Sequence, residues 1–216
     1  MLALDGTTPA INALTFNGTN GTIAQGTGGT LTLRNNGSAV APTINVAGGT
    51  PTISAPVSFA NTVTMTATGV NDQLTISGPI GGAGALIKTG PGTLSLSGTN
   101  TYAGKTTVNG GTLSATSEAS LGTVPGTPQA DQIPINNNAR LAFTGNANLT
   151  ANQGITVGAG NGTLDVATGQ TAIIGGAISG SGTLTKTGDG TMDYRNVTTG
   201  IAGPVTLTAG TFAVHN

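Results

Sequence analysis

The 216-residue chain contains no cysteine and no tryptophan, and only 3% of its residues are aromatic. Without cysteine it forms neither a disulfide framework nor a thiolate metal site, although this leaves the redox compartment open. Charged residues make up 6% of the chain, against about 25% in an average soluble domain. Helical folds cover their exposed faces with Glu, Lys, Gln and Arg, so this shortage predicts an all-β protein.

The charge distribution also restricts the partners and the location of the chain. Six basic residues are scattered along a chain of net charge −1, which argues against nucleic acid because phosphate binding needs clustered Lys and Arg. No apolar run approaches the ~20 residues of a membrane span, so we expect no membrane insertion. The first 16 residues lack the basic and apolar regions of a signal peptide, so export would need signals outside this chain.

Short pairs of apolar residues, separated by one polar residue, recur along the chain. Leu31/Leu33, Ile44/Val46 and Leu164/Val166 are examples, and Gly, Asn or Thr follows most pairs. Alternation over three to five residues predicts short strands with one buried side, joined by tight turns. The pattern fits either an antiparallel sandwich or barrel, or a parallel solenoid.

Internal repetition favours the solenoid. The segment IGGAGALIKTGPGTLSL (80–96) recurs without a gap as ISGSGTLTKTGDGTMDY (178–194). Each coil of a solenoid stacks on a near copy of itself, whereas a sandwich needs no sequence period. We predict a single solenoid over residues 1–216, with degenerate copies at about 12–116 and 139–214 and an irregular insertion at about 117–138.

The run 82–113 closely resembles the autotransporter-associated β-strand repeat, also called the passenger-associated transport repeat, of bacterial surface proteins. The matching positions are Gly84, Leu86, Lys88, Gly90, Gly92, Leu94, Leu96, Gly98, Asn100, Tyr102, Gly104, Thr106, Gly111 and Leu113. A second, degenerate copy keeps Leu184, Lys186, Gly188 and Gly190. The resemblance implies a right-handed parallel β-helix, and about 20 residues per coil would give roughly ten short coils.

The stretch GTNTYAGKTT (98–107) superficially suggests a phosphate-binding loop, but two features exclude a nucleotide site. The required first glycine is displaced, since Thr99 occupies its position, and no helix follows Lys105. The resemblance instead implies a solenoid corner, with Lys105 on the surface. Tyr102 would pack in that corner, although sugar stacking is an alternative. Lys88 and Lys186 would be edge charges that deter incorrect strand pairing.

Catalytic and metal chemistry have little support. Polysaccharide-degrading enzymes on β-helices need grouped carboxylates, and the seven acidic residues here are mostly far apart. Asp189 and Asp193 are close enough to suggest calcium, but a solvated turn is favoured over a metal site. The single histidine, His215, is interpreted as an inert tail residue or the remnant of a tag. Ice binding would need one Thr-x-Thr pair per coil in constant register, but the Thr-x-Thr pairs of this chain are irregularly spaced, which argues against it.

The sequence therefore predicts a non-enzymatic extracellular structural segment, without a cofactor, such as a stalk, spacer or filament-forming unit. Because neither terminus shows a polar cap, we expect continuation in a longer solenoid or end-to-end self-association. The main alternative is an adhesin or glycan-binding module that recognises surface glycans through side loops such as 117–138.

Overall fold

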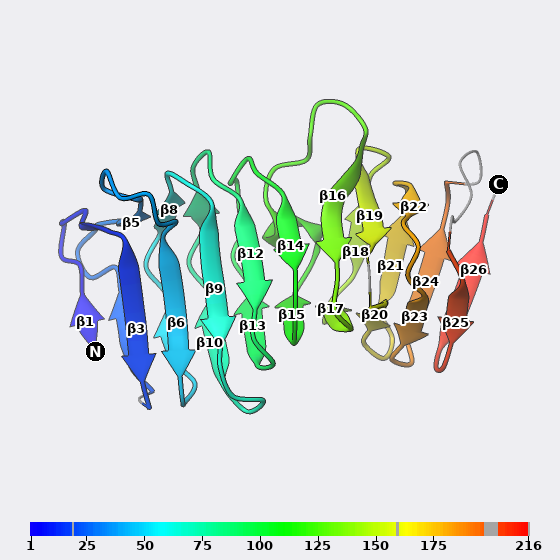
Figure 1. Cartoon of the computed structure of the whole chain (residues 1–216), viewed down its shortest axis with the longest axis horizontal. Coiled ribbons are helices and arrows are strands. Elements are labelled where there is room, and N and C mark those ends of the chain that lie inside the picture. The colour runs from blue at the N-terminus through cyan, green and yellow to red at the C-terminus, as the bar shows by residue number, and fades with distance from the viewer. Residues whose placement is uncertain (19, 159, 197–202, 216) are drawn as a thin grey trace. The chain divides into compact units, whose positions relative to one another are not determined.

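The computed structural model describes residues 1–18, 20–158, 160–196 and 203–215. Within these ranges the chain consists of short strands and a single 3₁₀ turn, η1 (Glu118–Leu121). The strand pairings described within these ranges are all parallel, as Figure 1 shows for the stacked arrows. The prediction of an all-β parallel solenoid is therefore confirmed. The chain divides into two compact units, the first 1–104 with 119–123 and the second 105–118 with 124–216.

Unit 1 is built from three parallel sheets, which the chain visits in turn on each coil. The first sheet contains β1 (Leu2–Ala3), β4 (Thr22–Ala24), β7 (Thr52–Ile53), β10 (Gln73–Ile76) and β13 (Thr93–Leu96). The second contains β2 (Ala10–Ile11), β5 (Leu31–Leu33), β8 (Val57–Phe59) and β11 (Ile80–Gly81). The third contains β3 (Ala13–Asn17), β6 (Thr43–Ala47), β9 (Val63–Ala67) and β12 (Leu86–Thr89).

Unit 2 has the same three-sided plan. Its first sheet contains β15 (Thr112–Ala115), β17 (Ala139–Phe143), β20 (Gly162–Val166), β23 (Leu184–Thr187) and β25 (Val205–Leu207). The second contains β18 (Ala147–Leu149), β21 (Thr171–Ile174), β24 (Thr191–Tyr194) and β26 (Thr211–Val214). The third contains β14 (Thr106–Val108), β16 (Gln129–Ile135), β19 (Gln153–Val157) and β22 (Ile178–Ser179). Residues 124–128 form a loop that projects beyond the start of β16 (Figure 1).

Alternating side chains fill the interior of each unit. In unit 1, Ile23 pairs with Ile53, and Ile53 with Ile76, so that identical side chains stack between coils. In unit 2, Leu141 pairs with Leu164 in the same manner. All five are at most 5% exposed. Because paired strands lie about 4.8 Å apart, each aliphatic side chain contacts its copy in the next coil, and burial contributes about 1.5–3 kcal/mol per residue.

Candidate functional site

The lysine of the first repeat copy lies inside unit 1. Lys88 is on β12 in register with Met65 of β9, at an inward position that is aliphatic in the preceding coils. Its exposed fraction is 0%, so the prediction of an edge charge is wrong. The long side chain instead runs through the core, and its Nζ donates to the carbonyl oxygens of Thr89 and Gly90, at 2.8 and 2.9 Å.

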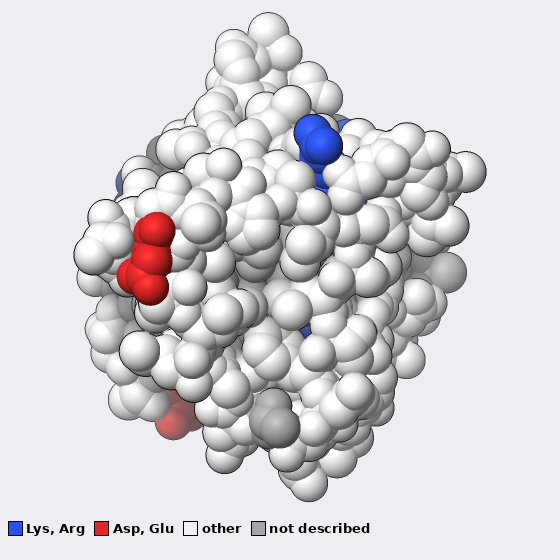
Figure 2. All heavy atoms as spheres, turned by 90° about the vertical axis from the view of Figure 1, so that its left-hand side faces the viewer, with Lys and Arg blue, Asp and Glu red and all other residues white. Residues whose placement is uncertain are grey.

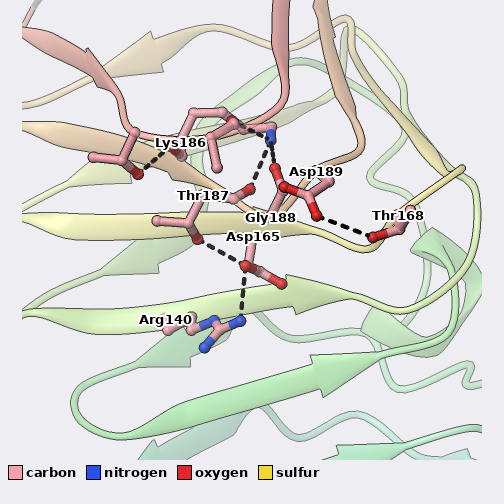
Figure 3. A network of polar contacts seen from close by, with 9 residues as sticks. Arg140, Asp165, Thr168, Lys186, Thr187, Gly188 and Asp189 are labelled. Carbon is pink, nitrogen blue, oxygen red and sulfur yellow. Dashed lines mark hydrogen bonds and ion pairs between the residues drawn. The ribbon is translucent and has the colours of Figure 1, made fainter.

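The lysine of the second copy repeats this arrangement in unit 2, which corrects the same prediction. Lys186 is on β23, in register with Leu164 and Leu207, and is also 0% exposed. Its Nζ donates to the carbonyl oxygens of Thr187 at 2.6 Å, Gly188 at 2.8 Å and Ala209 at 3.3 Å. Figure 3 shows the ammonium curled back toward the turn that follows its own strand. We call this arrangement, Lys-Thr-Gly-x-Gly with the ammonium on the turn carbonyls, the lysine corner.

The glycines of the lysine corner have separate physical roles. The first of each pair, Gly90 or Gly188, has a φ of 76° or 71°, in the left-handed region that glycine tolerates best. The second lies against the neighbouring coil. A Cβ on Gly92 would come within 2.4 Å of the Asp72 carbonyl oxygen, and one on Gly190 within 2.3 Å of the Ala167 oxygen. The two glycines of the recurring Lys-Thr-Gly-x-Gly motif are therefore needed for the turn and its packing.

The buried amines are electrostatically unusual but inaccessible. Burial lowers the pKa of Lys88 to about 8. Burial also lowers the pKa of Lys186, and the charges of Asp165 and Asp189 oppose that effect. A lowered lysine pKa is common at catalytic sites. However, the space beside Lys88 has no room for a water-sized molecule, so no substrate reaches its amine in this conformation.

An ion-pair network covers the outer side of the lysine corner in unit 2. Arg140 and Asp165, from the neighbouring strands β17 and β20, form an ion pair at 2.7 Å. The Thr187 hydroxyl donates to the same Asp165 oxygen at 2.7 Å (Figure 3). Burial would raise the pKa of Asp165, but the bonds from Arg140 and Thr187 outweigh it and hold the pKa below its usual value. The network joins three adjacent strands.

The two calcium candidates have different partners. Asp189 is an exposed turn residue whose carboxylate accepts a bond of 3.4 Å from the Thr168 hydroxyl. Asp193 is 5% exposed and pairs with Arg195 at 2.7 Å and with His215 at 2.6 Å. The description of His215 as an inert tail residue is therefore wrong, since it joins β26 to β24. Among the described residues no three Asp, Glu or His side chains are grouped as a metal site.

The other half of the repeat motif also forms a corner. Asn100 is buried, accepts from the Ile80 amide at 2.8 Å and donates to the Ser120 carbonyl at 2.6 Å. Tyr102 is 0% exposed, with its ring 5.5 Å from that of Phe59, so the prediction of corner packing is confirmed. Lys105 is on the surface, as predicted, where it pairs with Asp131.

Sequence reasoning missed the role of Asp72, which is 8% exposed at the end of a turn. Its Oδ2 accepts from the amides of Gly69 at 2.7 Å and Gly48 at 3.0 Å, and from the Thr68 hydroxyl at 3.3 Å. The Gly69 bond is the main reason that its pKa is lowered. An aspartate three residues after glycine in TGVND is the available signal, but it does not identify the partner in the preceding coil.

Two open hollows lie on the outer surfaces, one on each unit. A hollow of about 430 Å³ on unit 1 is lined by Arg34, Asn35, Asn36, Gly37, Ala60 and Asn61. A hollow of about 440 Å³ on unit 2 is lined by Glu118, Asn146, Ala147, Asn148, Thr171 and Ile173. The face in Figure 2 shows how sparse charge is, since isolated red and blue groups lie on an otherwise white surface. Each hollow has one charged lining residue, Arg34 on unit 1 and Glu118 on unit 2.

Comparisons with known proteins find a matching family and a similar adhesin. Residues 86–115 match the family described as Passenger-associated-transport-repeat. The chain is 34% identical over 146 residues to the adhesin BmaC autotransporter of Brucella suis biovar 1 (strain 1330). That match covers 68% of this chain and 4% of the adhesin. No solved structure matches significantly.

The family match covers the lysine corner of Lys88 and the corner of Asn100 and Tyr102. It begins on β12 with the lysine corner, continues through Asn100 and Tyr102, and ends on β15. The prediction of the family from residues 82–113 is confirmed, and the chain carries a passenger-associated transport repeat.

Proposed function

We propose that this chain is a non-enzymatic segment of the surface-exposed passenger of a bacterial autotransporter, and that its solenoid coils act as a spacer. The observation that carries the proposal is the use of the repeat residues. Lys88, Lys186, Asn100 and Tyr102 are buried and bonded or packed within the fold, so the recurring positions support coil stacking. No helix in the described ranges is both long and apolar enough to cross a membrane.

The test removes these coils from the full-length host protein and measures how far its distal part extends from the cell surface. A spacer predicts that the distance falls by about 4.8 Å per deleted coil while distal binding activities persist. An unchanged distance would contradict the spacer role. End-to-end association of copies stays a prediction, which sedimentation of the purified chain over a concentration series would test.

Adhesion is the second candidate function, and two observations favour it. The similar Brucella protein is named an adhesin. Unit 2 also carries an outward hollow with a carboxylate from the 117–138 segment. An adhesive segment predicts that cells displaying the deleted protein lose attachment even when the removed length is replaced by unrelated coils. A spacer predicts that the replacement restores attachment, so this experiment separates the two functions.

A further inference from the structure

The Glu118 hollow, defined by the six residues that line it on unit 2, has a fixed framework. Glu118 Oε2 accepts from the backbone amide of Asn148 on β18 at 2.9 Å, which holds the Glu118 side chain against the second sheet of unit 2. Asn146 Oδ1 accepts from the Thr171 amide of β21 at 2.8 Å. Asn148 and Ile173 are cross-strand neighbours on the outer side. Bonds to the backbone of β18 and β21 therefore position the side chains of Glu118 and Asn146.

Several polar groups in the Glu118 hollow remain available to a ligand. The Asn148 side-chain amide is exposed and has no hydrogen bond among the described contacts. The side-chain nitrogen of Asn146 and Oε1 of Glu118 likewise have no hydrogen bond among the described contacts, because Asn146 bonds through Oδ1 and Glu118 through Oε2. Ile173 adds a partly exposed apolar surface beside them. The hollow thus offers donors, acceptors and one aliphatic patch.

This set matches a pyranose ring, which combines neighbouring hydroxyl groups with an apolar C–H face. The volume of about 440 Å³ lies within the range of small-molecule sites, about 300–1,000 Å³. No aromatic residue lines the hollow, so we expect weak binding of a single sugar unit. A phosphate or sulfate group fits poorly, because the one charged lining group is a carboxylate.

We propose that the Glu118 hollow binds an amino sugar, with the carboxylate of Glu118 facing the ligand's ammonium group. Glu118 forms no ion pair among the described residues, so its charge is available to a cation. Exposed ion pairs contribute modestly, which corresponds to a preference of roughly two- to five-fold over an uncharged sugar. The proposal rests on the adhesive candidate function above and names its ligand class.

The experiment compares three sugars of one ring type by NMR saturation transfer and titration on the whole chain. The probes are glucosamine, glucose and glucuronic acid, which differ in charge. Expected affinities decrease in that order. Glu118→Gln keeps an amide oxygen for the Asn148 bond but removes the charge, so the preference for glucosamine over glucose should fall to about one. Arg34→Gln, in the comparable hollow on unit 1, should leave the preference unchanged.

Absence of saturation transfer from all three sugars would overturn the proposal, as would a glucosamine preference that survives Glu118→Gln. Attachment of cells displaying the full-length protein gives an independent readout of the adhesive function. If deletion of the segment abolishes attachment while none of the three sugars shows saturation transfer, adhesion stands and the amino-sugar site is refuted. If the replacement coils restore attachment but glucosamine still binds through Glu118, the adhesive function fails and the sugar site stands.

Discussion

Replacing Lys186 by methionine tests whether the lysine corner stabilises the fold. The substitution keeps an unbranched side chain between Leu164 and Leu207 but removes the donor to the carbonyl oxygens of Thr187, Gly188 and Ala209. Two effects of opposite sign compete. Methionine avoids the cost of burying an ammonium, whereas the three carbonyl groups lose a charged partner.

The loss of hydrogen bonds should prevail. A bond to a charged group contributes about 1.5–3 kcal/mol, so three give at least about 4.5 kcal/mol before relief of desolvation. Removing one partner of a buried charged contact typically costs about 3–5 kcal/mol. The carbonyl groups that Lys186→Met leaves behind are neutral, so we expect the lower end of this range of about 3–5 kcal/mol. Lys186→Met should therefore lower the free energy of unfolding by about 3 kcal/mol. Lys186→Ala also removes about three buried methylenes at about 0.8 kcal/mol each, which gives about 5 kcal/mol in total.

The assay is urea denaturation followed by circular dichroism at pH 7, with hydrogen exchange to localise the opening to residues 184–194. Leu164→Met is the matched control. It occupies the adjacent inward position, is 0% exposed, and should cost less than about 1.5 kcal/mol. If Lys186→Met unfolds at the same urea concentration as the unmodified chain, the ammonium does not hold the turn and the reasoning is refuted.

Three further predictions concern pH and packing. Burial lowers the pKa of Lys88 from 10.5 to about 8. Between these pH values the folded state binds fewer protons than the unfolded state, so the free energy of unfolding should rise with pH. Denaturation of Lys88→Met over the same pH range should not show this rise. The bond from Arg195 is the main cause of the lowered pKa of Asp193. The ionised carboxylate therefore contributes stability above pH 3.8, and this contribution is lost as the pH falls through the pKa of Asp193 in the folded state. The stability of Asp193→Asn should depend less on pH in acid denaturation. Gly104→Ala should lower the melting temperature, because its Cβ would come within 2.6 Å of backbone, whereas the control Gly126→Ala meets nothing within 4 Å and should not.

The architecture could be predicted from the sequence because its causes are local and repeated. Alternation such as Leu31/Leu33 specifies which side of a strand is buried, and the repetition of whole segments specifies parallel stacking. The resemblance to the passenger-associated transport repeat, rather than this alternation, placed Tyr102 in a corner and Lys105 on the surface.

The positions of the charged side chains were harder to predict. Lysine is rarely buried, so composition statistics place Lys88 and Lys186 outside. The correct signal was positional, since both occupy inward positions of an alternating strand one residue before Thr-Gly. Asp72 and Asp193 depend on partners more than 20 residues away, Gly48 and His215, and no local pattern identifies such contacts.

The lysine corner also indicates where binding function should be sought in this chain. A recurring residue in a solenoid can serve stacking or recognition, and here Lys88 and Lys186 are both fully buried against their own turns. We therefore expect any binding function at exposed positions that do not recur. Glu118 is such a position, because it lies outside both repeat copies and its carboxylate lines an open hollow. In this chain the repeated residues build the scaffold, and we propose that exposed residues that do not recur, such as Glu118, supply the binding surface.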